Sequence, residues 1–340
     1  MVNDARDGRV GVVGLGLVGG SLARLLAARG VDVVATDTDA GTRGDARAVG
    51  LRVADDLADL CAERPDVVVL AVPLRAVRTT AAELAPLLAG GDATVTDVGS
   101  VKGPVRAAVL AAGLGDRYVG AHPMAGTEHS GFAASDAGLL DAAPWAVTVA
   151  EPGGAAPDEP RRLAQVLRLV TGPLAGTAAV VTDDRHDEAA ALVSHVPHVL
   201  ATQLLNAVAG APVRDLALGL AAGSFRDGTR VALTDPARTE AMVTENAAWV
   251  APALRKAVRD LEVVIGALET NGSLHDVFHA ADDVRELRAG GRARPAGPEE
   301  SLPVGDAWTS GLVDDLVARC TAGAVVVGVD DGAVRVRAPR

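Results

Sequence analysis

A densely polar stretch, Gly120 to Gly131 with the sequence GAHPMAGTEHSG, carries side chains suited to proton transfer. Its first histidine, His122, directly follows the strand-like segment YVGA, so it lies at the end of a predicted strand. A histidine that titrates near neutrality can accept the proton that an alcohol loses when its carbon gives up a hydride. Ser100 follows another predicted strand and could hydrogen-bond either this histidine or the reacting hydroxyl. Taken alone, a histidine beside a proline is more typical of a hydrogen-bonded loop residue.

A second motif, VGVVGLGLVG from Val10 to Gly19, has the pattern of a dinucleotide-binding turn. Gly14, Gly16 and Gly19 have G-x-G-x-x-G spacing, directly after a predicted strand and at the start of a predicted helix. The first glycine permits the tight turn, the second lets the backbone approach a pyrophosphate, and the third lets helix and strand pack closely. We expect the cofactor to contact the whole turn, which also contains Leu15, Leu17 and Val18.

The next predicted strand ends at Asp37, where a carboxylate can accept hydrogen bonds from an adenosine ribose. Asp37 would repel a 2′-phosphate and so favours NAD over NADP, although Arg43 lies close enough in sequence to soften this preference. The alternative is that Asp37 only caps a turn. Val72, Pro73 and Ser100 also follow strands, and ligands of open α/β sheets bind beyond the carboxyl ends of strands. We therefore count these three residues among the cofactor contacts.

The scaffold for these residues is predicted by two successive patterns. Valine-rich runs alternate with alanine- and leucine-rich stretches in the first part of the chain, which is typical of a parallel sheet covered by helices on both faces. From about Pro160, apolar residues recur at three- and four-residue spacing, which predicts helices. We predict an α/β fold with a Rossmann-type, doubly wound, mostly parallel sheet in residues 1–155 and a helical region in residues 156–290. Residues 291–340 are expected to form a linker and a small helix-hairpin tail that turns at Asp331 and Gly332.

Composition and charge exclude several classes of function. A formal net charge of −12 disfavours nucleic acid and anionic membranes as partners, because both attract basic surfaces. The sequence has no run of the roughly 20 apolar residues that cross a bilayer. Cys61 and Cys320 lie far apart and match no metal-binding or redox spacing. We therefore expect a soluble, cytoplasmic protein without a metal site.

Five motifs together resemble the prephenate/arogenate dehydrogenase family of tyrosine biosynthesis. They are GLGLVGGSLA, DVGSVKG, HPMAGTEHSG, VSHVPHVLA and FRDGTRVALTDP, in this order over roughly residues 9–271. The resemblance implies a Rossmann-type domain followed by a helical domain that forms a homodimer. It also implies NAD(P)-dependent oxidative decarboxylation of a small-molecule substrate, either prephenate or arogenate.

The resemblance assigns roles to individual residues. His122 matches the histidine that bonds the ring hydroxyl of the substrate and accepts its proton, and Ser100 matches the serine beside it. Glu128 resembles an active-site glutamate linked to gating and to the polar network around the ligand. Arg230 matches the arginine that grips the side-chain carboxylate of the substrate, a use that suits a planar, permanently charged group.

Two further histidines belong to the SHVPH motif. His198 resembles the histidine that assists substrate binding, whereas His195 could bind substrate or lie in the core or an interface. His186 is nine residues before His195, about half a turn round a regular helix, so the histidines are not expected to converge. Pro197 should kink this helix and could turn one histidine toward a cleft. We predict a structural role for His186.

The same sequence is compatible with alternative substrates and functions. The chain departs from the family at Ala237, Arg238 and Thr239, where the family often has a bulky aromatic, and in the segment AAGSF, where glycines are common. Both places could set substrate preference, and an amino-substituted prephenate is a possible substrate. A β-hydroxyacid or imine dehydrogenase would share the Rossmann-type domain followed by a helical domain. That function would not explain the polar segment HPMAGTEHSG. A non-catalytic NAD-binding sensor is opposed by the joint presence of His122, Ser100 and Arg230.

Overall fold

The nucleotide-binding part is built on a four-stranded parallel sheet in the order β2-β1-β3-β4. The computed structural model describes residues 8–127, 129–151, 154–290 and 297–339. Every residue of these four strands is buried, as expected for valine-rich strands covered on both faces. The strands are β1 (Val10–Val13), β2 (Val33–Thr36), β3 (Val67–Leu70) and β4 (Thr94–Asp97). This confirms the predicted α/β fold with a parallel sheet.

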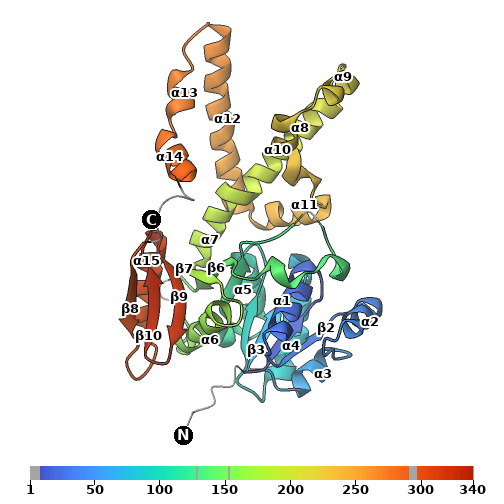
Figure 1. The fold of residues 1–340 in the computed structure, drawn as a ribbon, viewed down its shortest axis with the longest axis vertical. Helices are drawn as coiled ribbons and strands as arrows, with labels where there is room; N and C mark the ends of the chain where they lie inside the picture. Colours follow the sequence, from blue (N-terminus) through green and yellow to red (C-terminus); the bar gives the residue numbers. More distant parts are fainter. Residues whose placement is uncertain (1–7, 128, 152–153, 291–296, 340) are drawn as a thin grey trace.

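Five helices connect or follow these strands. They are α1 (Leu17–Ala28), α2 (Ala40–Ala48), α3 (Leu57–Ala62), α4 (Val77–Leu88) and α5 (Gly103–Ala111), and they surround the sheet in Figure 1. Parallel strands need such crossover connections, which bring all four carboxyl ends to one edge of the sheet. The turn before α1, the segment after β3 and the segment after β4 therefore meet at that edge.

A second sheet continues from β4 through a single parallel bridge between Val95 and Tyr118. Its strand order is β5-β6-β7-β9-β10-β8. β5 (Gly120–Pro123) and β6 (Pro144–Val149) are antiparallel, and the described part of their connection contains the 3₁₀ turns η3 (Phe132–Ala134) and η4 (Ala137–Leu139) without a crossover helix. β6 and β7 (Thr177–Thr182) are parallel, with α6 (Glu159–Thr171) as the crossover helix. His122 thus lies on a strand between two differently oriented neighbours.

The tail completes this second sheet. It forms β8 (Glu299–Pro303), α15 (Ser310–Thr321), β9 (Val325–Asp330) and β10 (Ala333–Arg337), with Asp331 and Gly332 between the last two strands as predicted. β9 pairs with β7 between Ala178 and Val326, and α15 packs against β7. The tail is therefore continuous with the nucleotide-binding part. The predicted boundary at residue 155 precedes α6 and β7, both of which also belong to that part.

The helical part starts at α7 (Asp183–Ala190), directly after β7. α7 continues into the π turn η5 (Ala191–His195) and then into α8 (Val196–Ala209). The remaining elements are α9 (Arg214–Gly219), α10 (Gly223–Thr229), η6 (Arg230–Leu233), α11 (Pro236–Glu245), α12 (Ala247–Glu269), α13 (His275–His279) and α14 (Asp282–Gly290). Figure 1 shows α8 and α12 projecting away from the sheets and diverging. Among the described helices, none combines the length and apolarity needed to cross a bilayer.

Candidate active site

The glycine turn before α1 has the geometry that a dinucleotide needs. Gly14 has a φ of 99°, and a Cβ there would lie 2.5 Å from the Ala71 carbonyl oxygen. A Cβ on Gly19 would lie 2.0 Å from the Gly14 carbonyl oxygen, so helix and turn require glycine at both places. A Cβ on Gly16, in contrast, would meet no atom within 4 Å, and Gly16 caps α1 without a side-chain hydrogen bond. The open space and the uncapped amides at the start of α1 fit a bound pyrophosphate.

Asp37 follows β2 and contacts this turn. Its Oδ2 accepts a 2.7 Å hydrogen bond from the Leu15 amide, and its Oδ1 accepts one of 2.9 Å from the Asp39 amide. Arg43 donates to the carbonyl oxygens of Asp37 and Thr38 at 2.7 and 3.1 Å. Asp37 thus shapes the turn, and each carboxylate oxygen retains acceptor capacity for a ribose hydroxyl. Both interpretations of Asp37, a turn residue and a ribose ligand, are compatible with these contacts.

The segments after β3 and β4 border the same turn. A Cγ atom of Val72 lies 3.2 Å from the position of a Cβ on Gly14, so the segment containing Val72 and Pro73 lies beside the glycine turn. Ser100 is half-buried in the segment between β4 and α5. These residues and the glycine turn therefore share the carboxyl edge of the sheet, as their positions in the sequence predict.

A buried ion pair holds the β4 and β5 ends together. The side chains of Lys102 and Asp97 are 0% and 1% exposed, and Lys102 Nζ donates to Asp97 Oδ2 and, at 2.7 Å, to the Ala121 carbonyl. The Tyr118 hydroxyl donates to the other Asp97 oxygen at 2.8 Å. Removing one partner of such a pair costs about 3–5 kcal/mol, because the remaining charge stays buried. This pair fixes the segment carrying Ser100 against the strand carrying His122.

His122 on β5 contacts a second histidine. Its Nδ1 lies 2.9 Å from Nε2 of His186 on α7, and the two rings meet edge to face with centroids 5.2 Å apart. His186 Nδ1 in turn lies 2.7 Å from the Asp187 carboxylate. The structural role predicted for His186 is therefore incomplete, because this residue is directly bonded to the candidate base. The adjacent histidine and aspartate in the sequence DRHDE were the available signal.

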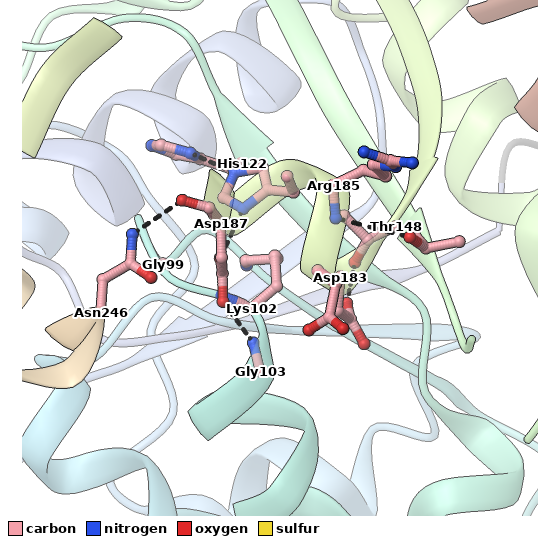
Figure 2. Close-up of polar contacts among 12 residues, drawn as sticks. Gly99, Lys102, Gly103, His122, Thr148, Asp183, Arg185, Asp187 and Asn246 are labelled. Carbon is pink, nitrogen blue, oxygen red and sulfur yellow. Dashed lines mark hydrogen bonds and ion pairs between the residues drawn. The ribbon is translucent and has the colours of Figure 1, made fainter. Parts of the chain in front are cut away.

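The Asp187 carboxylate is held by the start of α5. It accepts hydrogen bonds from the Lys102 amide at 2.7 Å and the Gly103 amide at 2.9 Å, which Figure 2 shows as dashed lines. Asn246, at the junction of α11 and α12, donates to the Asp187 carbonyl at 2.8 Å. Its amide nitrogen also lies 2.9 Å from His195 Nδ1. No sequence pattern pointed to Asn246, whose partners are far away in the chain.

Burial favours the neutral form of His122 and of His195. Part of residue His122 is accessible to solvent, yet desolvation of its enclosed imidazole lowers the pKa well below its ordinary value. His186, Lys102 and His195 lower that pKa further. Burial also lowers the pKa of His195 to about 4. A neutral imidazole at the sheet edge can accept a proton at physiological pH.

A π turn explains the placement of His195. Pro197 has no amide hydrogen for the carbonyl four residues earlier, and instead of a simple kink the chain widens into the π turn Ala191–His195. Because a π turn advances more slowly around the axis, His195 is less than half a turn from His186. His186 contacts the Asp187 carboxylate, and His195 contacts the side-chain amide of Asn246, which is the partner of Asp187. The expectation that they diverge was wrong because it assumed a uniform α-helix.

The remaining predicted residues have varied surroundings. His195 is fully buried, and its Nε2 has no hydrogen-bond partner among the described residues. His198 is half-buried, and its Nδ1 donates to the Ser194 carbonyl at 2.8 Å. Arg230 is exposed at the start of η6, which packs against α8, the helix that carries His198. Glu128 lies outside the described residues.

Comparisons with known proteins agree with this architecture. The model of the prephenate dehydrogenase nucleotide-binding domain matches residues 22–181, and that of the prephenate dehydrogenase dimerization domain matches residues 182–279. Cyclohexadienyl dehydrogenase of Zymomonas mobilis is 35% identical over 262 residues, covering 74% of this chain and 86% of the relative.

Two solved structures have the same arrangement. A putative prephenate dehydrogenase from Corynebacterium glutamicum has a TM-score of 0.78 and 32% identity, covering 92% of this chain and 96% of the other. Prephenate dehydrogenase from A. aeolicus, solved with hydroxyphenyl propionate and NAD⁺, has a TM-score of 0.72 and 29% identity, covering 83% of this chain and 97% of the other. The chain described here therefore belongs to the prephenate dehydrogenase family.

Proposed function

We propose that this protein is an NAD-dependent dehydrogenase of tyrosine biosynthesis. It oxidatively decarboxylates prephenate to 4-hydroxyphenylpyruvate or arogenate to tyrosine. The observation that carries the proposal is the position of His122 at the sheet edge that also holds the glycine turn, where burial lowers the pKa of its imidazole. The family relationship supports the same activity, since the Z. mobilis relative is named cyclohexadienyl dehydrogenase.

The cofactor site is supported by the turn and by Asp37. The amides at the start of α1 and the space beside Gly16 would hold the pyrophosphate, while Asp37 would accept hydrogen bonds from the ribose. Arg43 is engaged with two carbonyl oxygens at the end of β2, which favours NAD over NADP. When bound, NAD⁺ supplies the acceptor for the hydride of the hydroxyl-bearing ring carbon.

His122 is the proposed base and Ser100 its partner. His122 accepts the proton of the substrate hydroxyl, and Ser100 hydrogen-bonds the imidazole or the hydroxyl. Loss of CO₂ then aromatises the ring, a step driven by the chemistry of the substrate. Glu128 is proposed as an accessory residue in the polar surroundings of the ligand.

The helical part is proposed to bind the rest of the substrate. Arg230 grips the side-chain carboxylate, a use that suits an exposed guanidinium with no ion pair among the described residues. His198 lies on α8, and η6, which begins at Arg230, packs against this helix. The buried Nε2 of His195, which has no hydrogen-bond partner among the described residues, is a further donor that a ligand or water could satisfy.

The helical part is also proposed to form a homodimer, in line with its dimerization-domain match. Large apolar side chains project from α8 and α9 and from α12 to α14, among them Leu204, Leu216, Leu261, Ile265 and Phe278. Exposed apolar surface on this scale marks an interface. We accordingly propose three units: a nucleotide-binding unit through Thr182, a helical substrate and dimerisation unit through residue 290, and a tail that extends the sheet. A cytoplasmic location fits the two free cysteines.

Steady-state kinetics test this function directly. Purified protein is assayed with prephenate and with arogenate, each with NAD⁺ and with NADP⁺, by the absorbance of the reduced nicotinamide. We expect turnover with at least one substrate and a higher kcat/KM with NAD⁺. A protein that binds NAD⁺ but reduces it with neither substrate would overturn the proposal.

A further inference from the structure

We propose that His186 and Asp187 act as positioning residues behind His122, fixing which ring nitrogen of His122 is basic and taking up charge when it is protonated. The inference deepens the proposed function and rests on it. It is carried by a continuous chain of contacts, from His122 Nδ1 to His186 Nε2 at 2.9 Å and from His186 Nδ1 to the Asp187 carboxylate at 2.7 Å. His186 and Asp187 are each only 4% exposed.

The chain of contacts determines the tautomers. The Asp187 carboxylate can only accept, so His186 donates to it from Nδ1, and in the proposed resting state this is the one proton on the His186 ring. His186 Nε2 is then an acceptor, and His122 must donate to it from Nδ1. The lone pair of neutral His122 is therefore on Nε2, the nitrogen that does not face His186. One carboxylate thus makes Nε2 of His122 the basic atom.

The same chain can accommodate the proton. The substrate O–H bond breaks, its electron pair stays on oxygen, and the proton binds His122 Nε2. The Nδ1 proton of His122 can then move to His186 Nε2, which leaves His122 neutral with its proton on Nε2. The positive charge then resides on His186, beside the Asp187 carboxylate. No proton is gained or lost in this second transfer.

The surroundings hold the Asp187 carboxylate in place. Two amides at the start of α5 donate to its carboxylate, and anions are stabilised at such helix ends. The one ion pair of Asp187 among the described residues is with His186, so its carboxylate is available to the contact series that runs from His122 through His186. The neighbouring charges are paired elsewhere, since Lys102 is bonded to Asp97 and Asp183 to Arg106. His195, also nearby, is neutral because burial lowers its pKa to about 4.

Two substitutions of His186 separate positioning from folding. In His186→Gln, the amide oxygen can still accept from His122 Nδ1, whereas His186→Leu removes the acceptor. We expect kcat to fall by about 10- to 100-fold in His186→Leu, less than for loss of the base itself, with KM changed by less than about twofold. His186→Gln should recover much of the lost kcat. His275→Gln, an exposed histidine on α13, is the control and should match the wild type. Equal kcat in all the proteins, or a Gln variant as impaired as the Leu variant, would overturn the proposal.

A spectroscopic measurement needs no turnover. In ¹⁵N-histidine-labelled protein at neutral pH, NMR should show His122 protonated on Nδ1 and bare on Nε2, with His186 also protonated on Nδ1. Spectra of the His122→Asn and His186→Gln variants assign the two rings. If His122 is protonated on Nε2 in the resting protein, the proposed positioning role of His186 and Asp187 is refuted even if the enzyme is active. The expected tautomers in a protein that turns over neither prephenate nor arogenate would instead refute only the proposed function.

Discussion

The side-chain amide of Asn246 donates to Nδ1 of His195 at 2.9 Å, and the two residues are 2% and 0% exposed. This bond requires His195 to be neutral, because a protonated imidazole has no acceptor nitrogen. It joins the α11–α12 junction to the π turn. The stability of the helical part should therefore depend on the protonation of His195.

Acid should destabilise the protein through this residue. Burial lowers the pKa of His195 from 6.5 to about 4, so between these values the unfolded chain binds the proton and the folded chain does not. The free energy of unfolding should therefore rise with pH across this window and fall as pH drops from 6.5 toward 4. In His195→Asn, whose Oδ1 can still accept from Asn246, the pH dependence should be shallower. Urea unfolding followed by circular dichroism at several pH values measures it, with His275→Asn as the exposed control. A slope unchanged in His195→Asn would contradict the assignment.

Replacement of the base should slow the reaction without weakening cofactor binding. We expect His122→Asn to lower kcat by about 10²- to 10⁴-fold while KM changes little, because proton acceptance belongs to the transition state. Since the pKa of His122 lies well below 6.5, the acid limb of the wild-type kcat/KM profile should also lie below pH 6.5. Stopped-flow and steady-state assays, with NAD⁺ affinity measured by calorimetry, check both points. Wild-type turnover in His122→Asn would rule out this base.

A methyl group at Gly16 should block the cofactor and spare the fold. Its Cβ would enter open space, and the φ of −72° suits alanine, so thermal stability should stay within a few degrees of the wild type. NAD⁺ affinity should fall by at least about tenfold, because the pyrophosphate must approach this backbone. Gly19→Ala is the contrasting variant, since its Cβ would collide with the Gly14 carbonyl and destabilise the protein itself. Calorimetric NAD⁺ binding at wild-type strength by Gly16→Ala would place the cofactor elsewhere.

Loss of the Arg230 guanidinium should act on substrate binding. We expect Arg230→Gln to raise the substrate KM by about 10- to 100-fold, the scale of a charge-assisted carboxylate contact, with NAD⁺ affinity unchanged. Arg214→Gln, another exposed arginine of the helical part, serves as the control. A parallel loss of NAD⁺ affinity in Arg230→Gln would indicate a folding defect, and an unchanged KM would exclude the contact.

A charge on the projecting helices should separate the subunits. Leu261 on α12 and Leu110 on α5 are 55% and 56% exposed, so they differ in location and not in accessibility. Leu261→Glu should shift the mass in light scattering from dimer to monomer, because a buried unpaired carboxylate is costly at an interface. Leu110→Glu should remain dimeric. A Leu261→Glu protein that stays dimeric would move the interface to another surface.

Local patterns predicted part of this molecule and long-range contacts determined the rest. The G-x-G-x-x-G spacing and the strand-end positions of Asp37 and His122 are local features of the sequence, so residue types and spacing were informative. His186 and Asn246 contribute through partners 64 and 59 residues away, which no local pattern encodes. Helical periodicity also assumed a constant value of about 3.6 residues per turn, and the π turn before Pro197 broke that assumption.

The pairing of β9 with β7 gives the order of synthesis a structural consequence. Translation produces β7 first and then the whole helical part. Only afterwards does it produce β9, the strand that pairs with the edge of β7. An emerging chain therefore carries an unpaired strand edge for more than a hundred residues of elongation, and such edges can pair with other chains. A chain that ends before residue 325 would therefore leave this edge of β7 without its β9 partner.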